Sequence, residues 1–310
     1  MSHWNMLALV GLGSVLAACN SKSSGGSTAS DAGFTGDAEM SSDTSIPGDS
    51  GESADSGGAT DTGSTGDGGA ATCPGSPDGG GLAYKGVVEL SRVGLPTPVR
   101  YNALAQIEPT ASYPPTGCTG TLVGACCYGT TPSDAGLPTL ESAGNITITD
   151  GTSTLATLMS GSYVASSTTD PTLTWLPGAM LKVTASGGTV GAFTATVAAP
   201  PYFTGVSPAF NAPITVHTSA DLVVSWTPSK RPCSKITVGL TQGALKPSAG
   251  CVVDDSAGTV TIPASMLGMF TATTGTAVIE RVEGTDTLAS NADIGVVVIN
   301  VQTTTTMYTP

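Results

Sequence analysis

Short apolar, β-branched segments dominate the sequence from Tyr84 onward, and turns rich in Gly, Pro, Ser and Asp separate them every eight to twelve residues or so. Ile146 and Ile148, for example, alternate with threonines. This spacing is typical of antiparallel sandwiches, and only Pro263 to Phe270 has helical spacing. We therefore expect an all-β, sandwich-like (immunoglobulin-like) fold with aligned sheets. The other expected strand segments are 99–107, 181–184, a run ending at Val197, 214–216, 222–226, 236–240, 258–262, 277–282 and 294–301.

The number of folded domains is less well fixed by the sequence. Residues 82–310 could form one large sandwich or two of roughly 110 residues each. A change of composition at Pro200-Pro201 favours two lobes, 82–199 and 200–310. Trp175 and Trp226 each precede a turn, and we expect both to be core anchors rather than ligand platforms.

A long polar segment precedes the expected strands. Residues 20–81 consist almost wholly of Gly, Ser, Asp, Thr and Ala, which cannot bury enough apolar surface to offset the entropy of ordering. The segment is therefore expected to be a disordered tether. It contains ten acidic residues and one base, Lys22, so it carries −9 of the chain's net charge of −13. The acidity belongs to the tether and says little about what the folded part binds.

The chain begins with an apolar run, Met6 to Ala18, which ends in Leu16-Ala17-Ala18-Cys19. The run is too short to cross a bilayer, which takes about 20 residues, but it suits a cleaved signal. It resembles the signal and lipobox of bacterial lipoproteins, although residues 1–5 lack the usual Lys or Arg. The resemblance implies that residues 1–18 are removed and that Cys19 is acylated, which attaches residues 19–81 to a membrane. Asn20, where Asp would favour the inner membrane, implies the outer membrane.

A second resemblance is at the level of a protein family. The lipobox, the Asp/Gly/Ser/Thr-rich tether and the run from Trp175-Leu176-Pro177-Gly178 to Ala199-Pro200 resemble uncharacterised surface lipoproteins of myxobacteria. The resemblance implies an extracytoplasmic location. It assigns no activity to any residue.

Seven cysteines are present, and setting Cys19 aside leaves an even number. In an exported protein an even number of cysteines indicates disulfides. Adjacent residues on a strand point to opposite faces, so Cys126 and Cys127 should have different partners. The pairing we favour is Cys233 with Cys251, at the two ends of a hairpin, and the other pairings stay open. The six candidates are Cys73, Cys118, Cys126, Cys127, Cys233 and Cys251.

Signals of catalysis are few. The only histidine after the signal is His217, with Asp221 four residues on, and a solvated strand-end histidine is the simpler interpretation. Asp254-Asp255 precede a Ser-Ala-Gly turn. Glu280 and Glu283 should face opposite sides of a strand and so form no acid–base pair. Neither a nucleophile elbow nor a zinc knuckle occurs, so we expect no metal and no cofactor.

One local feature favours binding. Lys230, Arg231 and Lys235 are concentrated in a chain with few bases, beside Cys233. Such a loop could bind an anionic surface polymer or a protein partner, or hold the acidic tether, although an ordinary solvated loop has the same composition. Nothing indicates nucleic-acid binding. We therefore expect a lipid-anchored, non-catalytic surface binding or structural module. The alternative is an extracellular polymer hydrolase.

Overall fold

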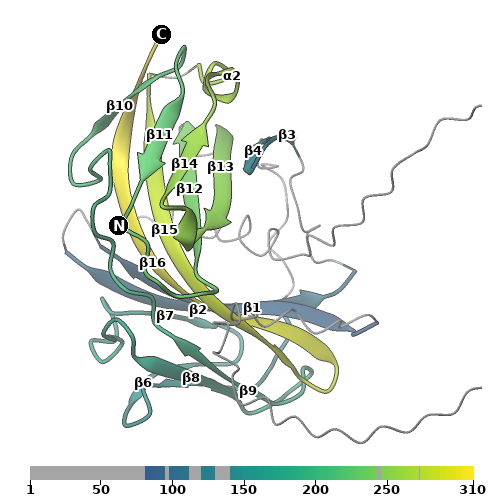
Figure 1. Ribbon diagram of the computed structural model, residues 1–310. Coiled ribbons are helices and arrows are strands. Elements are labelled where there is room, and N and C mark those ends of the chain that lie inside the picture. The colour runs from purple at the N-terminus through teal and green to yellow at the C-terminus, as the bar shows by residue number, and fades with distance from the viewer. Residues whose placement is uncertain (1–80, 95–97, 112–119, 130–139, 243–245, 272) are drawn as a thin grey trace, which may run out of the picture. The chain divides into compact units, whose positions relative to one another are not determined.

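The computed structural model describes residues 81–310 except 95–97, 112–119, 130–139, 243–245 and 272 (Figure 1). The expected signal 1–18, Cys19, the tether up to residue 80, Cys73 and Cys118 lie outside the described residues. In the part that the structure describes, no helix is long and apolar enough to cross a membrane.

The described residues are almost entirely β-structure, in several sheets, as expected for an all-β sandwich-like fold. Helical turns are confined to η1 (Asp255–Ala257) and α2 (Ala264–Leu267), the latter inside the one segment expected to be helical. The strands are β1 (Tyr84–Val93), β2 (Arg100–Pro109), β3 (Thr121–Val123), β4 (Cys126–Gly129), β5 (Ile146–Thr149), β6 (Thr154–Leu158), β7 (Val164–Ser166), β8 (Met180–Ala185), β9 (Phe193–Ala198), β10 (Ile214–His217), β11 (Leu222–Ser225), β12 (Lys235–Gln242), β13 (Lys246–Asp254), β14 (Thr259–Ile262), β15 (Thr274–Leu288) and β16 (Ala292–Thr309).

Three sheets organise these strands. The largest has the order β3-β4-β13-β12-β15-β16-β1-β2-β7, with β10 added beside the far end of β16. A four-stranded sheet has the order β6-β5-β8-β9, and β11 pairs with β14 in the smallest sheet. Most pairs are antiparallel, but β16 runs parallel to both β1 and β10.

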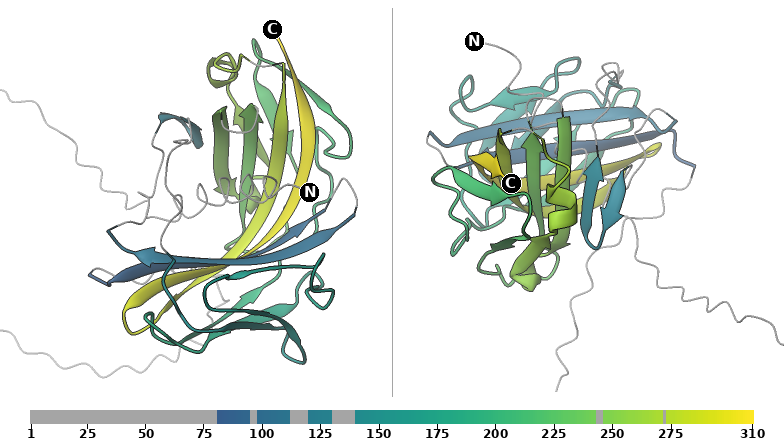
Figure 2. Two further views of the ribbon diagram at one scale, coloured as in Figure 1. Left: turned by 180° about the vertical axis from the view of Figure 1, so that it is seen from behind. Right: turned by 90° about the horizontal axis from the view of Figure 1, so that it is seen from above.

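The first hydrophobic core lies between the four-stranded sheet and one face of β1, β2 and the first half of β16 (Figure 2). Alternation produces it: Val88 and Leu90 of β1 are buried, and so are Ile146 and Ile148 of β5. Because every second side chain of a strand points to the same face, each strand contributes one apolar row. Trp175 is also buried here, as expected, and its ring meets Tyr101 edge-on with centroids 4.7 Å apart.

The second core is made by β10 to β14, α2 and the other half of the long strands. Trp226, Ile236 and Leu240 are buried in it, as are Met266 and Leu267 of α2. Trp226 is thus a core anchor as well, and its indole N–H donates to the backbone oxygen of Asp255 at 2.9 Å.

The hairpin of β15 and β16 belongs to both cores. Residues 294–298 of β16 supply Ile294, Val296 and Val298 to the first core, whereas Ala277, Ile279 and Tyr308 lie in the second. Figure 1 shows both strands running without a break from one core to the other. A two-residue turn closes the hairpin, where the amide of Ala289 donates to the oxygen of Ala292. The division at 199/200 therefore separates most of the two cores, but the C-terminal hairpin completes the first as well as the second.

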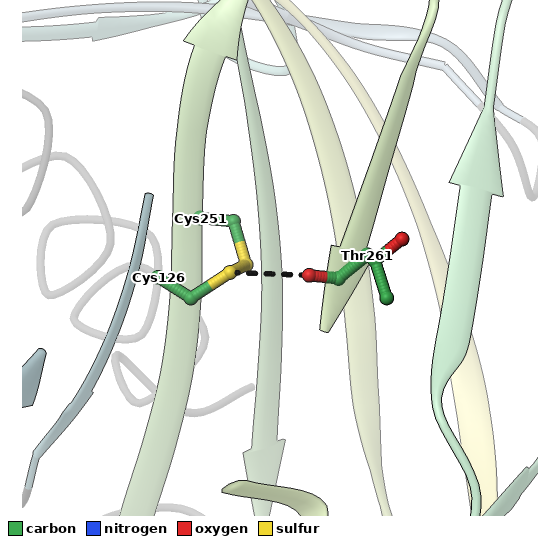
Figure 3. The surroundings of a disulfide bond; sticks show 3 residues. All are labelled: Cys126, Cys251 and Thr261. Carbon is green, nitrogen blue, oxygen red and sulfur yellow. Dashed lines mark hydrogen bonds between the residues drawn. A yellow bond between two sulfur atoms is a disulfide. The ribbon is translucent and has the colours of Figure 1, made fainter. Parts of the chain in front are cut away.

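A disulfide fastens β4 to β13. Cys126 and Cys251 lie opposite each other in the antiparallel register and are bonded, next to the backbone oxygen of Thr261 (Figure 3). Both side chains are buried in the second core. Cys127 and Cys233 are disulfide-bonded as well. Disulfides persist in oxidising compartments, so these bonds indicate an extracytoplasmic protein.

The favoured Cys233–Cys251 pairing is wrong, because Cys251 is bonded to Cys126. The sequence interpretation placed Cys251 at the end of a hairpin, but it lies inside β13, opposite Val238 of β12. Cys233 precedes β12 by two residues and is thus far from Val238 along the strand. The expectation that Cys126 and Cys127 have different partners is confirmed, because Cys251 can bond only one of them.

Candidate functional site: the loop before β12 and the charges behind it

The predicted basic loop connects β11 to β12. Its base is held by Asp255, whose Oδ2 accepts the backbone N–H of Ser229 at 2.7 Å. Lys230 follows with a φ of 64°, a left-handed conformation that residues other than Gly rarely adopt. The side chain of Lys230 is exposed. The loop therefore presents this lysine to solvent on a backbone fixed from below.

The other two cations of the loop each face a carboxylate. Nζ of Lys235 lies 2.5 Å from Oδ1 of Asp254, its neighbour in the register of β12 and β13. Nε of Arg231 lies 3.8 Å from Oε1 of Glu283 on β15. Lys230 and Arg231 thus lie on the loop and Lys235 begins β12, but the charges of Arg231 and Lys235 are largely offset. Lys230 is the cation that remains for an anionic partner.

A buried ion pair lies directly behind the loop. Arg281 of β15 and Asp255 of η1 are each about 1% exposed, with Nη2 of the arginine 3.1 Å from Oδ1 of the aspartate. The guanidinium also donates to backbone oxygens of Tyr202 at 3.1 Å and Thr227 at 2.8 Å, and it lies over the ring of Phe203. One buried cation therefore joins β15, η1, the loop and the segment that enters the second core.

Side chains of β16 and β1 contact the same connecting segment. Asn300 of β16 donates to the oxygen of Pro201 at 3.0 Å and accepts from Arg92 of β1 at 3.2 Å. The guanidinium of Arg92 in turn lies 3.9 Å from the ring centroid of Tyr202. The Pro200-Pro201 break is thus an ordered connection, and polar contacts hold it to both long strands.

Burial raises the pKa of Glu283, whereas the nearby Arg231 lowers it by less. Glu280, three residues earlier, lies on the opposite face of β15, beside Val278 and Val282, as predicted from the odd spacing. The sequence interpretation missed Asp255 and Arg281. Asp255 had only a turn signal, and a lone Arg in a strand carries no signal of burial.

A second group of carboxyls was not foreseen. Glu280 and Glu89 of β1 occupy the face of the large sheet that lies away from the two main cores, beside a small cluster of Val278, Val282, Ile299 and Val301. Burial, and then the charge of Glu89, raise the pKa of Glu280 to about 8. Burial raises the pKa of Glu89 to about 7, against a hydrogen bond from Ser91. Among the described residues Oε2 of Glu280 has no hydrogen-bond partner.

The structure does not bring His217 and Asp221 together as a base and its orienting group. Nδ1 of the exposed His217 lies 2.9 Å from the hydroxyl of Thr309. Asp221 instead accepts the backbone N–H of Ala264 at 2.7 Å, at the start of α2. His217 is therefore the solvated strand-end residue that the sequence favoured.

Comparisons with known proteins yield little. No family model and no curated protein matches this chain. Among the solved structures that match is one described as "Structural insight into host cell surface retention of a 1.5-MDa bacterial ice-binding adhesin", with 12% identity and a TM-score of 0.17. The match covers 73% of this chain and 66% of that chain, which is just under two thirds of its length. At this TM-score the likeness supports no inference about function.

Proposed function

We propose that this chain is a lipid-anchored, non-catalytic module of the bacterial cell surface, held to the outer membrane through Cys19. It displays a disulfide-bonded β-body at the end of a long acidic tether. By coil statistics a tether of residues 20–81 spans roughly 45 Å, so the body can meet partners well away from the bilayer. The role is binding or structural support.

The observation that carries this proposal is the oxidised state of the cysteines. The described residues contain Cys126, Cys127, Cys233 and Cys251, and all four are in disulfides. A body cross-linked in this way is suited to an oxidising compartment. Together with the lipobox at Leu16 to Cys19, it supports anchoring outside the cytoplasm.

Membrane attachment is tested with Cys19→Ser. The wild-type chain should enter the detergent phase and carry acyl groups on an N-terminal Cys19 by intact-mass analysis. The variant should keep its signal and lose the acyl mass. Cys73→Ser is the matched control, because it also replaces a cysteine by serine but should leave the acylation unchanged. An unmodified Cys19 in the wild-type protein would end the proposal of a lipid anchor.

The proposed ligand is an anionic surface polymer, bound weakly at Lys230. Lys230→Glu should weaken retention on an anionic polysaccharide column and lower the salt concentration needed for elution. Lys235→Glu is the comparison variant, because Asp254 already offsets Lys235. It should have a smaller effect. Retention that is insensitive to salt and to both changes would remove this loop as a binding site.

One observation favours the alternative, a polymer hydrolase. Two carboxyls with raised and different pKa values, Glu89 and Glu280, are the kind of pair that acid–base catalysis uses. Glu280 is only 4% exposed, however, which keeps a polymer chain away from it. Turnover of a polysaccharide that is lost in Glu280→Gln would favour the hydrolase over the binding module.

A further inference from the structure

Cys233 lies at a defined place in the large sheet. The amide of Asp255 donates to the oxygen of Ser234 at 2.9 Å, so the pairing of β12 with β13 continues one residue before Lys235. Cys233 is the next residue and takes part in a disulfide. Since Cys126 and Cys251 are bonded to each other, the partner of Cys233 is another cysteine of the chain.

Cys127 is too far away to be that partner. In the register of the sheet Cys127 of β4 lies opposite Gly250, and Gly250 lies opposite Gly239. Ser234 is five residues from Gly239, which is about 16 Å along the strand, and β4 lies two strands, about 10 Å, to the side. Disulfides need Cα atoms within about 7 Å. Cys127 and Cys233 must therefore have separate partners.

Cys118 is excluded by the same register. Gly120 lies beside Tyr128 and Gly129 of β4, and Gly129 is level with Thr241 of β12. Thr241 is seven residues, about 23 Å, from Ser234, and the two residue steps from Gly120 to Cys118 recover only about 7 Å. Cys118 can thus approach Cys127 but not Cys233.

Cys73 is within reach. It precedes Gly81, the first described residue, by eight residues, which can span about 28 Å. If β12 is extended back to Cys233, this residue is level with Glu89 of β1, which lies three strands to the side. Gly81 is eight residues before Glu89, so the distance from Gly81 to Cys233 is about 30 Å in a flat sheet. The span plus the width of a disulfide, about 5.5 Å, covers this distance.

We infer that Cys73 is disulfide-bonded to Cys233. The exclusion of Cys19 as the partner rests on its acylation in the proposed function. The two thiols lose two protons and two electrons by exchange with the disulfide of a thiol oxidoreductase, which is released as two thiols.

Tryptic mapping of the membrane-extracted full chain without reduction tests the bond. Cleavage after Lys230 and Lys235, with Arg231 protected by Pro232, isolates Cys233 in the five-residue peptide 231–235. Cys73 lies in the peptide 23–85, and Cys118, Cys126 and Cys127 all lie in 101–182. We expect 231–235 joined to 23–85. A link from 231–235 to 101–182 would overturn the inference.

The same digest separates the inference from the proposed anchor. A link from 231–235 to the peptide with Cys19 would overturn both, whereas an unacylated Cys19 with 231–235 joined to 23–85 would overturn the anchor alone. Variants give an independent readout. Cys73→Ser should expose one alkylatable thiol in 231–235, and the matched Cys118→Ser should expose none there. Labelling of Cys233 in Cys118→Ser but not in Cys73→Ser would reverse the assignment.

Discussion

Arg281 and Asp255 form an ion pair 3.1 Å long in which both side chains are almost completely buried. Asp254, the residue before, makes an exposed ion pair with Lys235. Two adjacent aspartates thus form one buried and one exposed ion pair, and the same substitution can be made at each.

Asp255→Asn is expected to destabilise the protein by about 3–5 kcal/mol, because it leaves the Arg281 guanidinium buried without a counter-charge. Asp254→Asn should cost less than about 1 kcal/mol, because solvent screens the Lys235 pair. Urea unfolding followed by tryptophan fluorescence measures both, since Trp226 contacts Asp255 directly. Equal losses in the two variants would contradict a special role for the buried pair.

The Cys126–Cys251 bond closes a loop of 125 residues in sequence separation. The loop-entropy model gives about 5 kcal/mol for a loop of this length. Replacing both cysteines by alanine should therefore lower the free energy of unfolding by a few kcal/mol. Both are replaced so that no free thiol remains to exchange with the other disulfides. An unchanged denaturation midpoint would show that the β4–β13 contact contributes little to the folded state.

Stability should fall as the pH rises from about 4.5 to about 8. In the folded protein the pKa of Glu280 is about 8 and that of Glu89 about 7, whereas both are near 4.5 when the chain is unfolded. Between these values the folded state binds more protons, so deprotonation of the unfolded chain lowers the free energy of unfolding. Below about 4.5 this contribution is fully present, and above about 8 it is lost.

Glu280→Gln should flatten this dependence and stabilise the protein near pH 8, by an amount on the order of a few kcal/mol. Asp254→Asn should leave the slope between pH 4.5 and 8 almost unchanged. Thermal denaturation at a series of pH values in one buffer mixture gives the comparison. A Glu280→Gln profile parallel to that of the wild type would mean that Glu280 is ionised in the folded protein.

Residues 82–199 should not fold alone. The first core lacks Ile294, Val296 and Val298 without the C-terminal hairpin, and β1 loses its partner β16. We expect no cooperative thermal transition from this fragment, whereas residues 82–310 should show one. Circular dichroism and the dispersion of amide NMR signals distinguish the two, and a cooperative fragment would establish residues 82–199 as an autonomous domain.

Local pattern predicted the strands but not their partners. The alternation of Ile146 with Ile148 and the Pro177-Gly178 turn identified β5 and β8 directly. The expected segment 277–282 is only the middle of β15, because Gly284 to Asp286 lack apolar character and are held in the strand by pairing with β16. Tyr84–Val93 was not singled out as a strand, although the change in texture at Tyr84 marked where it begins.

The burial of the charged residues could not be predicted from the sequence, for a physical reason. Asp255 follows Asp254 before a Ser-Ala-Gly turn, which is also the pattern of a solvated turn, and only the tertiary position of Arg281 distinguishes the two. Glu89 acts on Glu280 through its charge because β1 and β15 both flank β16 in the sheet, a relation that no local spacing encodes. The pairing of Cys251 failed likewise, because Gly250 and Pro247 hid the strand that contains it.

The parallel ladder between β1 and β16 joins residues roughly 200 positions apart in the chain. Contacts of such sequence separation form slowly, because a long loop must close before any of its hydrogen bonds can form. β1 is the first strand of the described residues and β16 is the last, so their ladder can form only after all the other described strands have been synthesised. The β1–β2 hairpin can form earlier, but the first core needs Ile294, Val296 and Val298 of β16 and so is completed only after β16 has been synthesised.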